Sequence, residues 1–131
     1  MTSTRKPALD LAETYLHVQD GPAVVPLDGG PAFWATIEQR TDVHDGRLVC
    51  VCRQTETWPT WEIHPAGDEV VCLLSGAVDF VLEEPGGERI VPLRNRDACV
   101  VPRGTWHRAI VHEPGDVLFI TRGAGTTHRP V

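Results

Sequence analysis

From residue 32 onward, short apolar runs alternate with turn-forming residues along the chain. The runs recur at intervals of roughly 8 to 12 residues and are separated by Gly, Pro and Asp, which is typical of short strands in an all-β domain. No interval is long enough for a crossover helix, so we expect antiparallel strands in a sandwich or a closed barrel. The predicted strands are residues 33–40, 47–54, 58–64, 70–74, 77–83, 88–93, 98–101, 106–112 and 117–121. The segment Glu84–Gly87, with sequence EPGG, predicts a tight hairpin.

The N-terminal part of the chain has a different pattern. Residues 8–19 carry apolar side chains at helical spacing, and Asp10 is suited to cap a short helix. Residues 20–31 are rich in Gly and Pro, which predicts an irregular arm with a short edge strand near residues 23–27. The expected organisation is a helix and arm in residues 1–31, a barrel in residues 32–122 and a tail in residues 123–131, all within one domain.

Size and charge limit the classes of partner. A chain of 131 residues forms one domain with a single core. Its net charge is −6 and it has one Lys, which disfavours nucleic acid because phosphate binding needs clustered basic residues. No apolar run approaches the roughly 20 residues that span a bilayer. Residues 1–7 do not resemble the start of a signal peptide, so we expect a cytoplasmic protein without a membrane partner.

The four cysteines do not have the spacing of a zinc knuckle. Cys50 and Cys52 are two residues apart in a predicted strand and share a face, whereas a knuckle has the spacing C-x₂-C. Together with Cys72 and Cys99 they lie in apolar segments, where a free Cys behaves as a small hydrophobe. We expect packing for all four; a redox or metal role for Cys50 and Cys52 is the alternative.

Four potential metal ligands lie at the ends of predicted strands. Glu62 and His64 are two residues apart and therefore project from the same face of one strand. The turn 65–68 leads to Glu69, whose strand can return beside the first. His107 begins a later strand, and the four groups converge if that strand lies close to residues 58–64. Two imidazoles and two carboxylates are compatible with Fe, Mn, Ni, Co or Zn.

The ligand pattern resembles that of a small single-domain cupin over residues 32–122. The first cupin motif, G-x₅-H-x-H-x₃₋₄-E-x₆-G, and the second, G-x₅-P-x-G-x₂-H-x₃-N, are matched at His64, Glu69 and Gly76 and at Pro102, Gly104 and His107. The resemblance implies a double-stranded β-helix barrel, the jelly-roll architecture. It also implies a divalent metal and a homodimer, commonly formed through N-terminal strands.

The chain departs from the cupin motifs in ways that affect function. Glu62 stands in place of the first His, Arg96 in place of the second motif's Gly, and Val111 in place of its Asn. Three His and one Glu would resemble the dioxygenase and decarboxylase members, and this ligand set does not match them. Alternatively Glu62 swings away and leaves His64, Glu69 and His107 as the ligands.

Strand parity predicts which side chains line the site. Trp58 and Thr60 should face inward with Glu62, Val71 should lie below Glu69, and Ala109 should lie below His107, so these four are the expected substrate-binding residues.

Two further features concern the periphery of the site. By the same parity, Trp61 and Trp106 should face away from the metal. The tail is polar and is expected to be disordered, or else to fold over the barrel mouth and offer His128 or Arg129 to a ligand.

Three functions are compatible with these residues. The first is a metalloenzyme of dioxygenase, isomerase or decarboxylase type that acts on a small oxygen-bearing molecule, with Glu62 as the candidate catalytic base. The second is a non-catalytic barrel that binds or senses a small ligand. The third is a barrel in which the metal only stabilises the fold.

Overall fold

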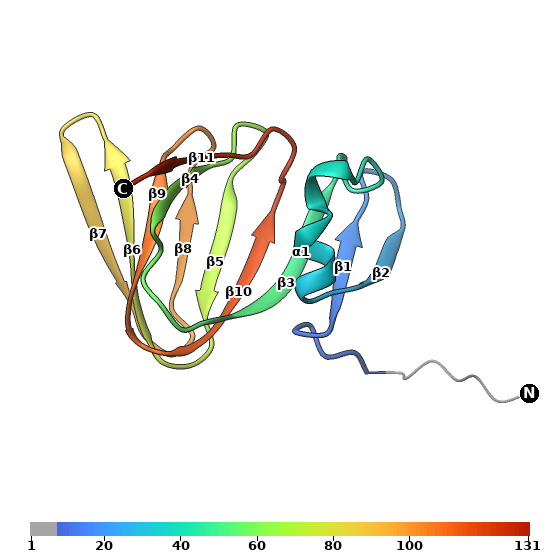
Figure 1. Cartoon of the computed structure of the whole chain (residues 1–131), viewed down its shortest axis with the longest axis horizontal. Helices are drawn as coiled ribbons and strands as arrows, with labels where there is room; N and C mark the ends of the chain where they lie inside the picture. The colour runs from blue at the N-terminus through green and yellow to red at the C-terminus, as the bar shows by residue number, and fades with distance from the viewer. Residues whose placement is uncertain (1–7) are drawn as a thin grey trace, which may run out of the picture.

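The computed structural model describes residues 8–131; residues 1–7, compared above with a signal peptide, lie outside the described part. Two antiparallel sheets lie face to face (Figure 1). A short helix, α1 (Pro31–Ala35), is followed by the 3-10 turn η1 (Ile37–Gln39). The strands are β1 (Thr14–Val18), β2 (Val24–Asp28), β3 (Arg47–Gln54), β4 (Thr60–Ile63), β5 (Glu69–Leu73), β6 (Ala77–Glu84), β7 (Gly87–Leu93), β8 (Ala98–Val101), β9 (His107–Glu113), β10 (Gly115–Thr121) and β11 (Thr127–Pro130).

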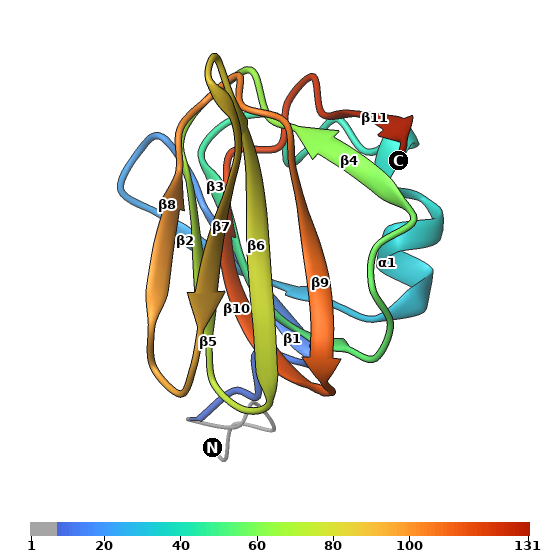
Figure 2. The same cartoon turned by 90° about the vertical axis from the view of Figure 1, so that its left-hand side faces the viewer.

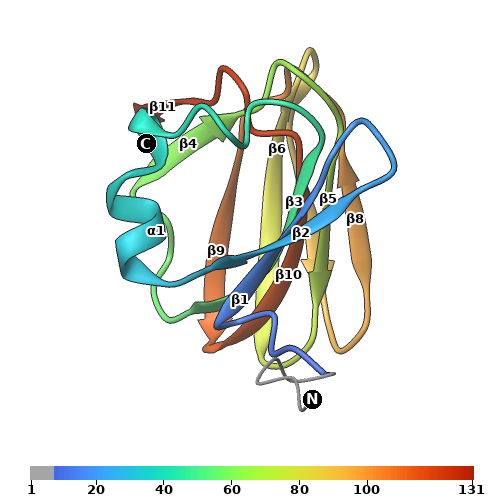
Figure 3. The same cartoon turned by 90° about the vertical axis from the view of Figure 1, so that its right-hand side faces the viewer.

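The strand order is that of a jelly roll. One sheet has six strands in the order β2-β1-β3-β10-β5-β8, and the other has five in the order β11-β4-β9-β6-β7. From β3 onward the chain crosses to the opposite sheet at each connection, except at the hairpin between β6 and β7. Figure 2 shows β6, β7 and β9 in front, and Figure 3 shows β1 and β2 in front, on the other side of the barrel. The predicted all-β jelly-roll class is confirmed.

The predicted strands from residue 47 onward are confirmed to within two residues at each end. The Glu84–Gly87 hairpin is also confirmed, since Glu84 and Gly87 are the last pair of the β6–β7 ladder. The edge strand expected near residues 23–27 is β2. These segments were predictable because their turns and their alternation are local properties of the sequence.

The predicted strand at residues 33–40 is wrong, because this segment forms α1 and η1. Pro31 occupies the first helical turn, where its missing N–H removes no hydrogen bond, and Gly30 enters the helix with a φ of 92°. Phe33 is buried and anchors the helix against the ring of Tyr15. Among residues 8–131, no helix is long and apolar enough to cross a membrane.

The predicted helix at residues 8–19 is also wrong, because its second half is β1. Tyr15 and His17 alternate with less buried neighbours, as a strand requires, and β1 pairs with β2 on one side and β3 on the other. Asp10 accepts a hydrogen bond from the Ala12 N–H and so stabilises a turn rather than a helix. Pairing in the sheet outweighs the weak helical pattern, because it satisfies the backbone on both sides of β1.

The tail does not follow the prediction of disorder. Its residues form β11, which pairs antiparallel with β4 and places His128 opposite Glu62. The guanidinium of Arg129 lies over the rings of Trp61 and Trp106 and is ion-paired with Glu83. These contacts hold the end of the chain against the five-stranded sheet and confirm that both Trp side chains face away from the site.

The hydrophobic core fills the space between the two sheets. Side chains at alternate strand positions, such as Val71, Leu73, Phe80 and Val117, are almost completely buried there. The ring of Phe80 packs edge-on against Trp58, which lies between the core and the polar site. The core therefore supports the site from below.

Arg96 has a backbone conformation that favours glycine, with a φ of 72°. It stands where the cupin motif has Gly, and its N–H donates to the Leu73 carbonyl in the turn before β8. We expect Arg96→Gly to raise the free energy of unfolding by about 0.5 to 1 kcal/mol, because the left-handed region is costly for a residue with a Cβ. Urea unfolding would measure this. Arg96→Ala keeps the Cβ and should give no such gain; an equal gain would place the cause in the side chain.

Candidate metal centre

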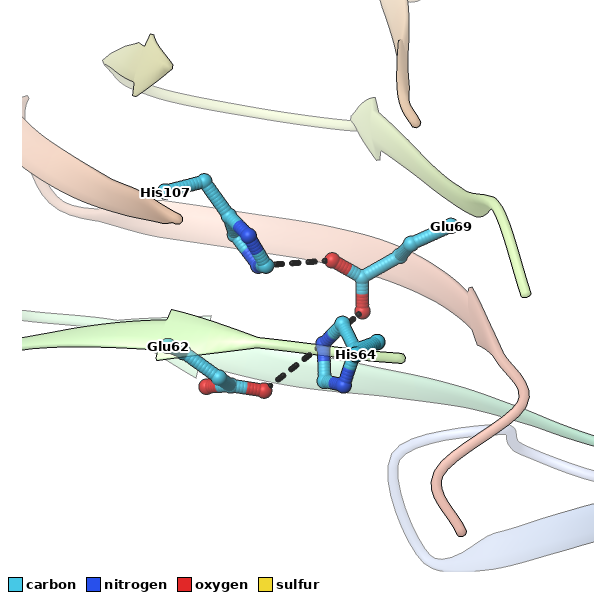
Figure 4. Close-up of side chains that lie close together, drawn as sticks. All are labelled: Glu62, His64, Glu69 and His107. Carbon is cyan, nitrogen blue, oxygen red and sulfur yellow. Dashed lines mark ion pairs between the residues drawn. The ribbon is translucent and has the colours of Figure 1, made fainter. Parts of the chain in front are cut away.

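Glu62, His64, Glu69 and His107 converge at one end of the barrel (Figure 4). Glu62 is in β4 and His64 directly follows it, whereas Glu69 and His107 are the first residues of β5 and β9. One potential ligand atom from each side chain lies within 4.8 Å of those of the other three. The sequence prediction that these four residues meet is therefore confirmed.

The two sheets contribute to the cluster from opposite sides. Glu62 and His107 are direct partners in the β4–β9 ladder of the five-stranded sheet. Glu69 comes from β5 in the six-stranded sheet, so the expectation that its strand returns beside β4 is wrong. The turn after His64 instead carries the chain across the barrel mouth, and Glu69 faces the two histidines across the interior.

The distances within the cluster are short. The Glu69 Oε1 lies 3.1 Å from the His107 Nε2, and its Oε2 lies 3.2 Å from the His64 Nε2. The Glu62 Oε1 lies 2.8 Å from the same His64 nitrogen. His64, Glu69 and His107 are buried, whereas the Glu62 side chain is 23% exposed and forms the outer side of the cluster.

Hydrogen bonds at the far side of each imidazole determine its tautomer. The His107 Nδ1 lies 3.0 Å from the Thr105 carbonyl oxygen, which only accepts, so Nδ1 carries the proton. The His64 Nδ1 lies 2.8 Å from the Thr126 Oγ1. Because the Thr126 hydroxyl donates to the Gly123 carbonyl, it must accept from His64. In their neutral forms, both rings therefore direct an unprotonated Nε2 at Glu69, as metal-ligating histidines do.

The donor atoms fit a divalent metal ion. The His64 Nε2, the His107 Nε2 and the Glu69 Oε1 are buried. When both imidazoles are neutral, these atoms face other acceptors of the cluster and have no hydrogen-bond partner among residues 8–131. Buried polar atoms without a partner are costly unless an ion or a ligand satisfies them. Thr121 orients the other Glu69 oxygen by donating to its Oε2.

Mutual interactions shift the pKa values of the cluster. Burial on its own would raise the pKa of Glu62, but His128 and His64 outweigh it and lower the pKa to about 2. Burial would lower the pKa of His64, but Glu62 and Glu69 outweigh it and raise the pKa to about 9. Glu69 likewise has a lowered pKa, because its interactions with His107 and His64 outweigh burial. Both carboxylates are thus charged at pH 7 without metal, and a divalent ion must displace the His64 proton to bind.

A cavity of about 640 Å³ opens beside the cluster. Its walls come from α1 and η1, the inner face of the six-stranded sheet and the start of the tail. The lining includes Glu62, His64, Glu69, Trp34, Ile37, Arg40, Leu48, Cys50, Cys52, Trp58, Phe119, Thr126 and His128. Such a cavity has the size and the mainly apolar lining of a small-molecule site.

Of the four predicted substrate-binding residues, Trp58 lines this cavity. Its indole N–H donates to the Gln54 side chain, which holds the ring in place. Thr60, Val71 and Ala109 are not among the lining residues, and Val71 and Ala109 are fully buried. Strand parity correctly places the last two on the inner face, but the inner face below the cluster is filled core.

Several residues of the site were missed in the sequence. Thr126, which orients His64, lies 62 residues from it and belongs to the tail. Trp34 and Ile37 reach the cavity because their segment is helical rather than extended. The tail does fold beside the site, with the His128 Nε2 3.4 Å from the Glu62 Oε2 and His128 in the cavity lining, and the binding of an anionic ligand by His128 stays a prediction. The spacing of Thr126 and His128, two residues apart as on one face of a strand, was the local signal for a strand in the tail.

Cys50 and Cys52 share the inner face of β3, as predicted. Their sulfur atoms are 3.8 Å apart, and both line the cavity. The interaction with Cys52 and then burial raise the pKa of Cys50, whereas the interactions with Cys50 and Tyr15 outweigh burial and lower the pKa of Cys52. All four cysteines are free, and Cys50 and Cys99 are buried.

Comparison with solved structures identifies the fold. The chain is similar to oxalate oxidase, with a TM-score of 0.52 at 18% identity over 62% of this chain and 45% of that one. A mutant of the Bacillus subtilis oxalate decarboxylase gives 0.52 at 16% identity over 65% and 24%. A cupin-2 domain protein from Shewanella frigidimarina gives 0.49 at 18% identity over 56% and 68%.

The first two similarities show that the chain shares the fold of oxalate oxidase and oxalate decarboxylase, which is the jelly-roll architecture that the motifs predicted. The chain spans less than half of the oxalate oxidase and about a quarter of the oxalate decarboxylase chain. No family model and no curated protein matches the chain. The comparisons therefore identify the architecture, and the site itself must supply the argument for function.

Proposed function

We propose that this protein is a metal-binding cupin that uses its metal to act on a small oxygen-bearing organic molecule. The observation that supports this is the set of three buried, unpartnered donor atoms on His64, Glu69 and His107, which point at one another beside a cavity. Glu62 completes the proposed ligand set at the outer side. Residues 8–131 act as one domain in this proposal, since β1, β2 and β11 are continuous with the barrel sheets.

The donor set indicates the class of metal. Two imidazole nitrogens and two carboxylates suit Fe, Mn, Ni, Co or Zn, and the two negative charges balance a divalent ion in a buried position. When bound, such a metal supplies Lewis-acid polarisation of a carboxylate, carbonyl or enediol oxygen, or redox chemistry if it is iron.

The residues around the centre have separate roles in this proposal. Trp58 and Phe119 form the apolar wall that holds the organic part of the substrate and excludes water. Glu62 is placed to accept a substrate proton, because it is the carboxylate nearest the open side of the cluster. Its lowered pKa keeps it unprotonated at neutral pH. The reaction class, whether dioxygenase, isomerase or decarboxylase, depends on the substrate.

A second candidate is a barrel that binds or senses a small ligand without catalysis. Two contacts favour it: Glu62 is paired with both His64 and His128, which leaves its carboxylate less free to act as a base. Ligand retention without turnover would distinguish this function from the first.

The proposed cellular location and partners of the protein rest on its net charge and its free cysteines. Four free cysteines are what a reducing compartment maintains, which supports a cytoplasmic location. The negative net charge disfavours nucleic acid and acidic lipid surfaces as partners. We also propose a homodimer.

Metal analysis of protein purified without a metal-affinity tag tests the centre. We expect about one Fe, Mn, Ni, Co or Zn per chain after reconstitution, and its loss in His107→Ala, because a buried ligand is removed. His112→Ala is the matched control, since His112 is exposed and pairs with Asp79 outside the cluster. A wild type that stays empty after reconstitution would refute the metal site.

Activity is tested on the reconstituted protein. Dioxygen uptake, carbon dioxide release and isomerisation are measured over a panel of small carboxylic acids, hydroxy acids and phenols. Turnover that is lost in His107→Ala supports the enzyme. Tight binding of a panel member without turnover supports the ligand-binding alternative.

A further inference from the structure

Two thiols on the cavity wall have no role in the proposed metal chemistry. Cys50 and Cys52 lie on the inner face of β3, and both line the cavity beside the metal cluster. Cys50 is buried, whereas Cys52 is partly exposed. Their sulfur atoms are 3.8 Å apart, which is within the range of a sulfur hydrogen bond. A Cys that only fills space needs no such partner, so the pair calls for an explanation of its own.

A chain of hydrogen bonds ends on the sulfur of Cys52. The indole N–H of Trp34 donates to the Tyr15 hydroxyl oxygen at 3.0 Å. The same hydroxyl lies 3.9 Å from the Cys52 Sγ. An indole N–H only donates, so the proton of the Tyr15 hydroxyl must point elsewhere, and among residues 8–131 the Cys52 sulfur is the acceptor within its reach. Tyr15 therefore donates to Cys52.

The thiol of Cys50 is a second donor to the same sulfur. Its Sγ is buried, and within the described part of the chain the Cys52 sulfur is its hydrogen-bond partner. Two donors that converge on one sulfur favour its anionic form. Accordingly, the interaction with Cys50 and that with Tyr15 outweigh burial and lower the pKa of Cys52, whereas the pKa of Cys50 is raised. The pair loses its first proton from Cys52 and keeps the second on Cys50.

We propose that Cys52 is a nucleophilic thiolate that reacts with hydroperoxides entering the cavity and becomes a sulfenic acid. The sulfur attacks the oxygen that carries the hydrogen, an S–O bond forms as the O–O bond breaks, and two electrons pass from the sulfur to the peroxide. An alkoxide leaves, or a hydroxide when the oxidant is hydrogen peroxide, and takes a proton from water. This site goes beyond the proposed function and does not depend on the metal.

The surroundings of Cys52 select the class of oxidant. Its sulfur faces a cavity of about 640 Å³ whose walls include the apolar side chains of Leu48, Trp58 and Phe119. The carboxylates of Glu62 and Glu69 line the same space and disfavour anionic reagents. A hydroperoxide is uncharged, and the apolar walls also accept one that carries an organic group.

The product does not close a disulfide with Cys50. Residues two apart on one strand have their Cβ atoms about 6.8 Å apart, whereas a disulfide needs about 3.5 to 4.5 Å. β3 does not contract to this extent, because β1 and β10 pair with it on both sides. Cys50 therefore serves as a hydrogen-bond donor rather than as a resolving thiol. The sulfenic acid persists until an external thiol reduces it.

Trapping of the sulfenic acid on the full-length wild type tests the proposal. The protein is treated with limiting hydrogen peroxide or an organic hydroperoxide in the presence of dimedone, and the labelled peptides are identified by mass spectrometry. We expect Cys52 to be labelled at least about 10-fold faster than Cys72. Cys72 is the internal control, because it is also partly exposed but lies outside the cavity and donates to the Arg96 carbonyl. A parallel series with a chelator excludes oxidants generated at a metal, so the result is separate from that of the metal site.

Variants of the two donors test how Cys52 is activated. Tyr15→Phe and Cys50→Ala each remove one donor and should slow the labelling of Cys52 about 10-fold, while Cys50→Ser retains a donor and should stay within about threefold of the wild type. The titratable groups that face Cys52 are Tyr15 and Cys50, since its partner on β10 is Val117. Ultraviolet thiolate absorbance should therefore show a higher pKa of Cys52 in the first two variants, which a purely structural role would not produce.

Three results would overturn the proposal. They are equal labelling of Cys52 and Cys72 in the wild type, a disulfide between Cys50 and Cys52 as the product, and unchanged labelling rates in both Tyr15→Phe and Cys50→Ala. The first two are measured on the wild type, so they stand even if a variant fails to fold.

Discussion

Replacing Glu69 by Gln is expected to lower the affinity of the protein for a divalent metal by at least about 100-fold, the largest effect of any single change at the centre. Glu69 places its two oxygens near the Nε2 atoms of His64 and His107, and it is almost completely buried. A Gln would offer one neutral oxygen and direct an NH₂ group at an imidazole or at the metal. It would also remove one of the two charges that balance the ion.

Glu62→Gln provides the comparison for this prediction. Glu62 is partly exposed and is held by His128, so its replacement should lower the affinity only about 10-fold. Isothermal titration with Mn²⁺ or Zn²⁺ measures both changes, with Glu88→Gln on exposed β7 as the control for a lost surface charge. An equal loss in both site variants would show that Glu62 is a full member of the ligand set. An unchanged affinity in Glu69→Gln would refute the centre.

The strands of the barrel were predictable because their signals are local. The segments that form β3 and β8 have the bounds that alternation and turn residues predicted. The errors at β1 and α1 have a different origin. Whether residues 14–18 are extended depends on their pairing with β2 and β3, whose partner residues lie between 6 and 33 positions away in the chain. Propensity carries no information about such partners.

The ligand set was predictable from spacing, and its geometry was not. Glu62 and His64 share a face by strand parity, but nothing local shows that β5 belongs to the opposite sheet.

The second large effect is expected at Thr126, which touches no metal. Its hydroxyl donates to the Gly123 carbonyl and accepts from the His64 Nδ1, so it keeps the imidazole proton on the side away from the cluster. Thr126→Val retains the shape and removes both hydrogen bonds. The His64 ring can then rotate, or carry its proton on Nε2 in place of Nδ1. We therefore expect the metal affinity to fall about 10- to 100-fold.

Thr126→Ser keeps the hydroxyl and should bind metal within about threefold of the wild type, while Thr127→Val, at the exposed neighbouring position in β11, should have no effect. If Thr126 only stabilised the fold, Thr126→Val would change the free energy of unfolding and leave the tautomer of His64 unchanged. Nitrogen NMR of the His64 ring in Zn²⁺-loaded protein therefore decides between the two roles. Wild-type affinity and an unaltered Nδ1–H tautomer in Thr126→Val would show that Glu62 and Glu69 orient His64 unaided. If the loss occurs, the tail is part of the metal centre, because the segment that closes the barrel also determines which nitrogen of His64 faces the metal.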